Sequence, residues 1–264
     1  MRQIWNTAAL CLPLALFMPV VAMGDEISDL AAQVAAAGHD VPPASVLRHA
    51  CDTDPLCVAR FLKDRIGAGA ALLPDTGMPG KSAGWHSRQA LHRVVNDMNG
   101  SLFIVPARFD AKAILNALDA ADGVGMPIAR VVLDLREIND ANNLDAMRRV
   151  ASLFTGKQDR AFTVEHSTGR AVDWTIPKPL RRLGTLKLEV WADADIDGAT
   201  EALAALLREH AGASILGEPT HNGGFLLERL AVTPGWALQV PTGRVSIPGQ
   251  DLSLGLIPDT SIPD

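Results

Sequence analysis

The pattern of apolar and polar positions divides the chain into a helical first part and a mixed second part. Residues 26 to 73 repeat apolar positions every three or four residues, which is typical of short amphipathic helices, and Asp54-Pro55 interrupts the pattern. Later in the chain, short apolar runs of strand length alternate with helical patterns. This alternation predicts strand–helix units with largely parallel pairing, and therefore an α/β fold class.

The elements of the second part can be placed one by one from their periodicity. Helices are expected over 109–123, 142–156 and 199–212, and strands over 101–107, 129–137, 185–193 and 213–220. A hairpin is expected over 161–176, and short β pieces around a Pro-Gly turn over 225–249.

A turn-rich connector separates the two parts. The segment LPDTGMPGKSAG, residues 73–84, contains three Gly and two Pro, residue types that favour turns and loops. We therefore expect a helical N-terminal region with its connector over 25–84 and an α/β domain over 85–264.

The first 24 residues have the features of a cleaved signal peptide. Arg2 precedes an apolar stretch over residues 8–21, and small residues follow that stretch. The stretch is short for a bilayer span and contains Pro13 and Pro19, and no later apolar segment is long enough to cross a membrane. We expect an exported protein, periplasmic or secreted after cleavage, with no stable membrane span.

Removal of that segment leaves two cysteines, Cys51 and Cys57, in the sequence HACDTDPLC. An even number of cysteines in an oxidising compartment predicts a structural disulfide that closes a short loop around Pro55. The alternative is two reduced thiols on one helical face. A structural zinc site is not expected, because no other Cys and no suitably spaced His pair accompany them.

Composition favours a folded, acidic protein. Hydrophobic residues make up 48% of the chain and charged residues 20%, which is enough apolar material for a substantial core. The 30 Asp and Glu outnumber the 24 Lys and Arg, and no Lys/Arg-rich run occurs. Because sequence-independent binding of phosphates needs a basic face, nucleic acid is not an expected partner.

Three stretches between about residues 101 and 260 follow the order and spacing of a known family. They are ARVVLDLRE with NNLDAMRRVASLFTG, then LKLEVWADADIDGATEALAALLREHAGASILGEPTHNGG, then GWALQVPTGRVSIPGQDLSLGLIPD. Together they resemble the catalytic domain of the C-terminal processing, or tail-specific, serine peptidases. The resemblance implies a crotonase-like α/β spiral core, here preceded by a short helical segment.

The residues that carry the family's chemistry are missing at the matching positions. That chemistry needs a serine at the start of a helix, a lysine about one strand later and Gly-Gly amides as an oxyanion hole. With Glu201 and the GEPT sequence of residues 217–220 as anchors, Gly198 stands at the serine position and Gly223 at the lysine position. The segment 137–142, where the family has a Gly-rich turn, contains no Gly. The resemblance therefore implies a catalytically degenerate site.

An alternative alignment provides other reactive groups. A shift of two residues would offer the hydroxyl of Thr200, and His221 lies in the loop where the base would be. A Thr-His pair could then replace the dyad. The other interpretation is that Thr200 helps to cap the helix and His221 is a solvated loop residue, because Glu201 fixes the helix phase.

Acidic residues at the same turn raise the question of a metal. Asp193, Asp195 and Asp197 precede Gly198 with the D-x-D-x-D-G spacing of a calcium loop, and Glu201 occupies the ninth loop position. The twelfth position, which normally carries a bidentate Glu, is an Ala. The alternative is an acidic turn at a helix N-terminus, where negative charge is favoured. No cofactor other than this calcium is indicated.

Three functional hypotheses follow. The first is an exported, degenerate peptidase fold that binds peptides or unfolded protein segments in the cell envelope, since strand addition to a sheet edge needs no nucleophile. The second is an active serine-type or noncanonical peptidase that uses Thr200, His221 or a metal bound at the Asp193 turn. The third is a structural or oligomerising envelope protein. The sequence leaves the oligomeric state open.

Overall fold

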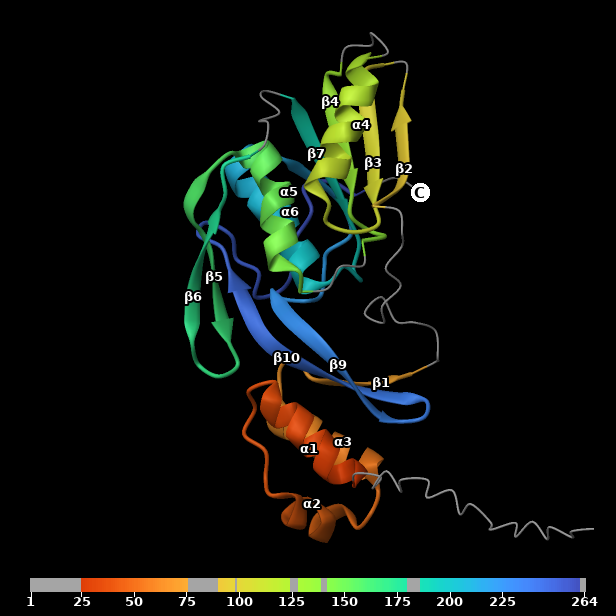
Figure 1. Cartoon of the computed structure of the whole chain (residues 1–264), viewed down its shortest axis with the longest axis vertical. Coiled ribbons are helices and arrows are strands. Elements are labelled where there is room, and N and C mark those ends of the chain that lie inside the picture. The colour runs from red at the N-terminus through yellow and green to blue at the C-terminus, as the bar shows by residue number, and fades with distance from the viewer. Residues whose placement is uncertain are drawn as a thin grey trace, which may run out of the picture.

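The computed structural model describes residues 25–75, 90–97, 99–123, 128–138, 142–179 and 186–261. The predicted signal peptide and most of the predicted connector lie outside these residues. In the part described, three N-terminal helices lie below two β-sheets, and the remaining helices lie against the upper sheet (Figure 1). None of the helices in these ranges is both long enough and apolar enough to cross a membrane.

The N-terminal region forms the predicted short helices. They are α1 (Glu26–Ala36), α2 (Ala44–Cys51) and α3 (Pro55–Ile66). The predicted interruption marks the start of α3, where the Asp54 side chain accepts a hydrogen bond from the Leu56 amide and Pro55 occupies the first turn. The predicted disulfide is formed between Cys51 and Cys57, with 5.5 Å between their Cα atoms, so it joins the end of α2 to the first turn of α3.

The upper sheet has the mixed topology of an α/β domain. Its strand order is β2 (Leu91–Asn96), β3 (Ser101–Pro106), β4 (Arg130–Asp134), β7 (Lys187–Ala192) and β8 (Ser214–Gly217). The last four strands are parallel, whereas β2 pairs antiparallel with β3. The helices α4 (Ala111–Gly123), α5 (Leu144–Thr155) and α6 (Gly198–Ala211) follow β3, β4 and β7 in the chain, as the sequence predicts.

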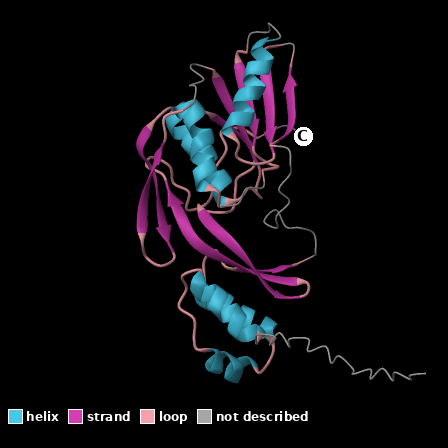
Figure 2. Ribbon diagram, viewed as in Figure 1, coloured by secondary structure: helices cyan, strands magenta, loops and turns pink. Residues whose placement is uncertain are grey.

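The lower sheet is antiparallel and links the two parts of the molecule (Figure 2). It contains β1 (Ala71–Pro74), β10 (Trp236–Ser246), β5 (Gln158–His166) and β6 (Ala171–Ile176) in that order, and β9 (Phe225–Thr233) pairs with β10. The predicted hairpin is β5–β6, and the predicted terminal β pieces form β9 and β10. Strand β10 pairs with β1 through its first half and with β5 through its last residues.

Two strands differ from the sequence predictions. Ala71–Pro74 belongs to the segment expected to be helical, yet it forms β1, because pairing with β10 satisfies its backbone. Strand β2 was not expected at all, since the apolar residues among its six, Leu91, Val94 and Val95, do not alternate with polar ones. In both places the partner strand, and not local periodicity, decides the structure.

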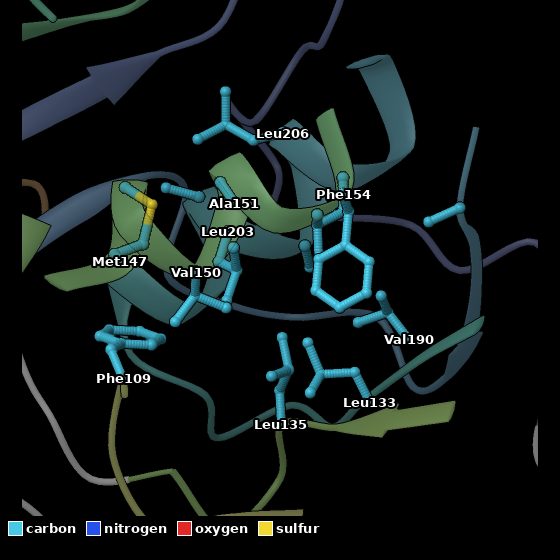
Figure 3. Close-up of a cluster of buried hydrophobic side chains, with 14 of the residues drawn as sticks. Phe109, Leu133, Leu135, Met147, Val150, Ala151, Phe154, Val190, Leu203 and Leu206 are labelled. Carbon is cyan, nitrogen blue, oxygen red and sulfur yellow. The ribbon is translucent and has the colours of Figure 1, made fainter. Parts of the chain in front are cut away.

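Two separate hydrophobic cores hold the described residues together. In the main core, Met147, Val150 and Phe154 of α5 pack between the upper sheet and α6 (Figure 3). In the second core, apolar side chains of α1–α3 pack against the end of β9 and the first half of β10. Leu62 of α3 and Leu238 of β10 are both fully buried there. The N-terminal helices are therefore anchored on strands from the end of the chain.

Candidate active site

The N-terminus of α6 follows the parallel strand β7. This is the position at which the family resemblance places the catalytic serine. Asp197 caps the helix, because its side chain accepts a 2.8 Å hydrogen bond from the Thr200 amide. In the preceding turn, the Asp193 carboxylate accepts a hydrogen bond from the Asp195 amide. Gly198 is the first residue of the helix and is buried.

Gly198 is closed off by another segment of backbone. A Cβ atom built on Gly198 would overlap the carbonyl oxygen of Phe225 and lie 2.7 Å from its carbonyl carbon. Phe225 is the first residue of β9, so the start of this strand crosses the helix N-terminus. No residue with a side chain fits here unless β9 moves, and no nucleophile can occupy this position in the observed backbone.

The predicted base position has a backbone that also favours glycine. Gly223 has φ +61° and Gly224 has φ +76°, both in the left-handed region. A Cβ atom on Gly223 would lie 3.4 Å from the carbonyl oxygens of Leu252 and Ser253. The C-terminal loop therefore lies in contact with this position, and the left-handed backbone is what disfavours a side chain here.

Glu201 is a fully buried carboxyl group that joins three segments. One carboxylate oxygen accepts a hydrogen bond from the Thr220 hydroxyl and one of 3.3 Å from the Leu256 amide, and the other accepts one of 2.5 Å from the Gly224 amide. Burial raises the pKa of Glu201 above its ordinary value, and the hydrogen bonds from Thr220 and Gly224 offset only part of this effect. Glu201 thus fastens the loop 217–224 and the C-terminal segment to α6.

Thr200 and His221 lie in different environments. The Thr200 side chain is completely buried, and its hydroxyl has no hydrogen-bond partner in the described part of the chain. His221 is exposed on the loop. Thr200 faces the interior and His221 faces solvent, so the structure does not bring them together as a pair.

The four acidic residues of the candidate calcium loop do not converge. Asp193 and Asp197 accept hydrogen bonds from the backbone of their own turn, whereas Glu201 is directed to the Gly224 side of the helix. Among the residues described, no group of three or more His, Cys, Asp or Glu side chains is placed to hold a metal ion. The structure gives no geometric support to calcium binding at this turn.

The sequence profile of peptidase family S41 matches residues 103–262, which is more than half of the chain and contains all of α6 and the loop 217–224. The chain belongs to peptidase family S41. The resemblance inferred from the sequence is thereby confirmed, together with the α/β fold class that it implied.

Solved structures with this fold differ widely from the chain in sequence. A lipoprotein from Streptococcus agalactiae has a TM-score of 0.54 at 14% identity, and the match covers 90% of this chain and 91% of the lipoprotein. The photosystem II D1 C-terminal processing protease matches with a TM-score of 0.47 at 18% identity over 74% of this chain and 48% of that protein. This S41 chain therefore spans about half the length of that protease. A search of the curated proteins found no relative by sequence.

The segment after β4, where S41 members carry the Gly-rich turn, is partly described. Arg136 forms a two-point ion pair with the buried Asp134, at 2.8 and 2.7 Å, and its guanidinium lies 5.1 Å from the centre of the Trp191 ring. Residues 139–141 lie outside the described ranges. Asn142 has φ +62°, which Asn tolerates better than most residues, and its side-chain amide donates a 2.8 Å hydrogen bond to the Leu227 carbonyl.

That hydrogen bond identifies the outer edge of β9. Within the ranges described, β9 pairs with β10 only, and the Leu227 carbonyl points away from β10 toward Asn142. Because strand residues alternate, Arg229 and Ala231 also direct their backbone groups outward. Among the residues described, the outer edge of β9 in this S41 domain therefore has no partner strand, and it starts at the closed helix N-terminus.

A polar hollow of about 300 Å³ lies beside Gly223. Its lining consists of Glu165, Arg244, Val245, Ser246, Gln250, Asp251, Leu252 and Ser253. Arg244 donates a 3.0 Å hydrogen bond from Nε to the Gly223 carbonyl, and its guanidinium lies 5.2 Å from the centre of the Phe225 ring. No sequence pattern identifies Arg244, Arg136 or Trp191 as site residues. The contact of Arg136 with Trp191 and those of Arg244 with Gly223 and Phe225 join segments that lie apart in the chain.

Proposed function

We propose that this protein is an exported S41 domain that has lost peptidase chemistry and acts by binding peptides or protein segments in the cell envelope. The observation that carries the proposal is the contact of the Phe225 backbone with Gly198. A serine at the start of α6 would overlap the Phe225 carbonyl, so the loss of the nucleophile is accompanied by closure of its space. A single reverse substitution would not reopen it.

The second position of the dyad supports the same interpretation. Gly223 provides no side chain, and its left-handed backbone is unfavourable for a lysine. The fallback residues do not replace the dyad, because Thr200 is buried and His221 is exposed. General-base catalysis needs the two groups within hydrogen-bond reach of each other.

The open edge of β9 supports a binding role. An extended peptide can add to such an edge through backbone hydrogen bonds alone, with Arg229 and Ala231 as the outward residues. The hollow around Arg244 offers further charged groups, and the Arg244 guanidinium contacts the ring of Phe225, the first residue of β9. The predicted signal peptide and the Cys51–Cys57 disulfide support an oxidising, extracytoplasmic location.

The test is to incubate the mature protein, residues 25–264, with denatured protein and a peptide library, with and without calcium. New termini are read by mass spectrometry, and peptides retained on the washed protein are identified in the same way. We expect no new termini and a retained set of peptides. The Ala231→Pro variant removes one outward amide of β9 and should reduce retention several-fold, because proline on an edge disturbs only the strand added to it.

Two outcomes would overturn the proposal. New termini that disappear in Thr200→Ala or His221→Ala would establish a noncanonical peptidase. Absence of both cleavage and retention would leave the structural hypothesis as the one supported. Retention that is unchanged in Ala231→Pro but lost in Arg244→Gln would place peptide binding in the hollow and not on the edge of β9.

A further inference from the structure

We propose that strand β2 is the contact surface of a homodimer, in which a second copy of this chain adds antiparallel to its outer edge. The two five-stranded upper sheets would then form one continuous sheet across a two-fold axis. This inference concerns a surface away from the closed site and is independent of the proposed function.

The two edges of the upper sheet differ in whether another segment of the chain pairs with them. At the β8 edge, the C-terminal segment covers the strand, because the Asp259 amide donates a 2.8 Å hydrogen bond to the Ile215 carbonyl and the Gly217 amide donates one of 3.0 Å to the Thr260 carbonyl. At the other edge, β2 pairs with β3 and with no other strand in the described part of the chain. One edge is thus closed within the chain, whereas the backbone groups of the other have no partner among the described residues.

The open edge also exposes apolar side chains. Val94 is 42% exposed and Val95 is 43% exposed, and as neighbours in a strand they lie on opposite faces of the sheet. Edge strands of monomeric proteins are commonly protected by charges, prolines or bulges. Strand β2 has one charge, Arg93, and one irregularity, between Leu91 and Arg93, yet the Val94-Val95 pair that follows them remains accessible.

The pairing of β2 with β3 fixes which backbone groups are free. The Asp97 amide donates a 2.9 Å hydrogen bond to the Ser101 carbonyl, so Asp97 and, by alternation, Val95 and Arg93 direct their backbone groups toward β3. Val94 and Asn96 direct theirs outward. Any strand that adds to β2 must therefore pair with these two residues.

One register of self-pairing provides hydrogen-bond partners for the outward backbone groups of Val94 and Asn96 and also brings opposite charges together. A two-fold axis at Val95 places Val94 opposite the partner's Asn96, so that the outward groups exchange backbone hydrogen bonds on both sides of the axis. The same register places Arg93 opposite the partner's Asp97, and the two Val95 side chains meet at the axis. Opposite charges at facing positions of an antiparallel pair are stabilising.

Asp97 is suited to this role. Its carboxylate accepts hydrogen bonds from the Ser101 and Asn99 amides, of which the one from Ser101 has the larger effect, and they lower the pKa of Asp97. The carboxylate is therefore ionised at neutral pH and held in the turn after β2. Arg93 is exposed on the same face of the strand, two residues from the axis.

The first test is sedimentation equilibrium of the mature protein, residues 25–264, over a range of concentrations and without peptide. We expect a reversible monomer–dimer equilibrium. Val95→Lys should weaken the dimer at least about tenfold, because it removes buried apolar area and places two like charges at the axis. The matched control is Val46→Lys on α2, where the valine is 49% exposed, and it should leave the equilibrium unchanged.

The register is tested by cross-linking and by charge. Facing residues in a non-hydrogen-bonded antiparallel pair have Cα atoms about 4.5 Å apart, which is within the range for a disulfide. Oxidised Val95→Cys should therefore give a covalent dimer, whereas Val46→Cys should not. Asp97→Asn keeps the turn acceptor but removes the charge, and it should weaken the dimer about twofold to tenfold at low salt and less at high salt.

A protein that remains monomeric at all concentrations would overturn the proposal, as would a dimer that Val95→Lys and Val46→Lys affect equally. A covalent dimer of Val95→Cys together with the loss of the native dimer in Val95→Lys would establish both the surface and its register. Neither measurement uses a peptide. Failure of the dimer proposal would therefore not bear on the proposed peptide-binding function.

Discussion

The N-terminus of α6 and the N-terminal helices are stabilised in different ways. Around α6, backbone segments from distant parts of the chain approach at contact distance, and one buried carboxyl group joins them. The helices α1–α3 are held by an apolar cluster on β9 and β10, by one disulfide and by exposed ion pairs. The first region depends on exact shape, and the second depends on apolar area and covalent linkage. Substitutions should therefore have large, position-specific effects in the first and graded effects in the second.

The largest effect is expected from Gly198→Ser. The new side chain would overlap the Phe225 carbonyl, so β9 or α6 must shift, and we expect a loss of more than about 3 kcal/mol in the free energy of unfolding. The measurement is denaturant unfolding of the purified variant. Gly123→Ala at the end of α4 is the matched control, because its Cβ would meet no atom within 4 Å, and it should change stability little.

The same substitution should also fail to restore chemistry. The double variant Gly198→Ser/Gly223→Lys carries both family residues, yet we expect no cleavage of denatured protein, because the serine has no room beside the Phe225 carbonyl and the left-handed backbone at Gly223 is unfavourable for a lysine. Mass spectrometry of the digestion mixture checks this. New termini from a folded double variant would contradict this prediction. They would mean that the start of β9 shifts away from the N-terminus of α6 at little cost and leaves room for the serine.

A moderate effect is expected from removal of the disulfide. Cys51→Ser/Cys57→Ser should reduce the free energy of unfolding by about 2 kcal/mol, the value for a short closed loop in the chain-entropy description. The loss should be concentrated in α2 and α3, and hydrogen exchange should show faster opening there than around α6. Equal loss of protection in the upper sheet would contradict the separation of the two regions.

Glu201 should make the free energy of unfolding fall as pH rises, the opposite of the effect of a carboxyl group with a lowered pKa. Its pKa is raised in the folded protein, so the folded state binds more protons than the unfolded state between the ordinary carboxyl pKa and the raised one. Stability from this group is greatest at low pH and is lost as pH rises through that window. Denaturant unfolding at a series of pH values should show this loss in the native protein and not in Glu201→Gln.

Glu189→Gln is the contrasting control for that measurement. Burial raises the pKa of Glu189, but Lys187 and Arg130 together lower it by more, so its net pKa is below the ordinary value. Its contribution is present above the ordinary carboxyl pKa and is lost as pH falls. Glu189→Gln should therefore remove stability at neutral pH that the native protein retains, the opposite change from Glu201→Gln.

The smallest effect is expected at the surface of the N-terminal helices. Arg48 of α2 pairs with Asp25, which caps α1, and both side chains are substantially exposed. Arg48→Ala should cost about 0.5 kcal/mol or less, since solvent screens such pairs. A loss as large as that from the disulfide variant would show that this pair, and not the apolar cluster, fixes the position of α1.

The sequence predicted the elements that carry their own pattern. The apolar runs of β3, β4 and β7 and the three-to-four spacing of α4, α5 and α6 identify them locally, and the disulfide follows from an even cysteine count. Strands β1 and β2 could not be predicted in this way, because short segments take the structure that a partner strand imposes. Their assignment requires knowledge of β10 and β3.

The same distinction applies to the site. The positions Gly198 and Gly223 follow from the order of motifs in the sequence, but the closure of Gly198 by Phe225 depends on where β9 crosses α6. The burial of the Thr200 hydroxyl, which has no hydrogen-bond partner among the described residues, and the exposure of His221 are likewise consequences of packing. The sequence indicates which catalytic groups are missing. Only the fold shows whether there is space for such side chains at those positions.

The placement of β9 and β10 has a consequence for biosynthesis. In synthesis, helices α1–α3 are made before β9 and β10, the strands that bury their apolar side chains. The hydrogen bonds of Asp259 and Thr260 to the β8 edge of the upper sheet form later still. Contacts of such long sequence separation form slowly. The emerging chain therefore keeps the apolar surface of α1–α3 uncovered until β9 and β10 have been made, and a product truncated before β9 would lack the contacts that complete the second core.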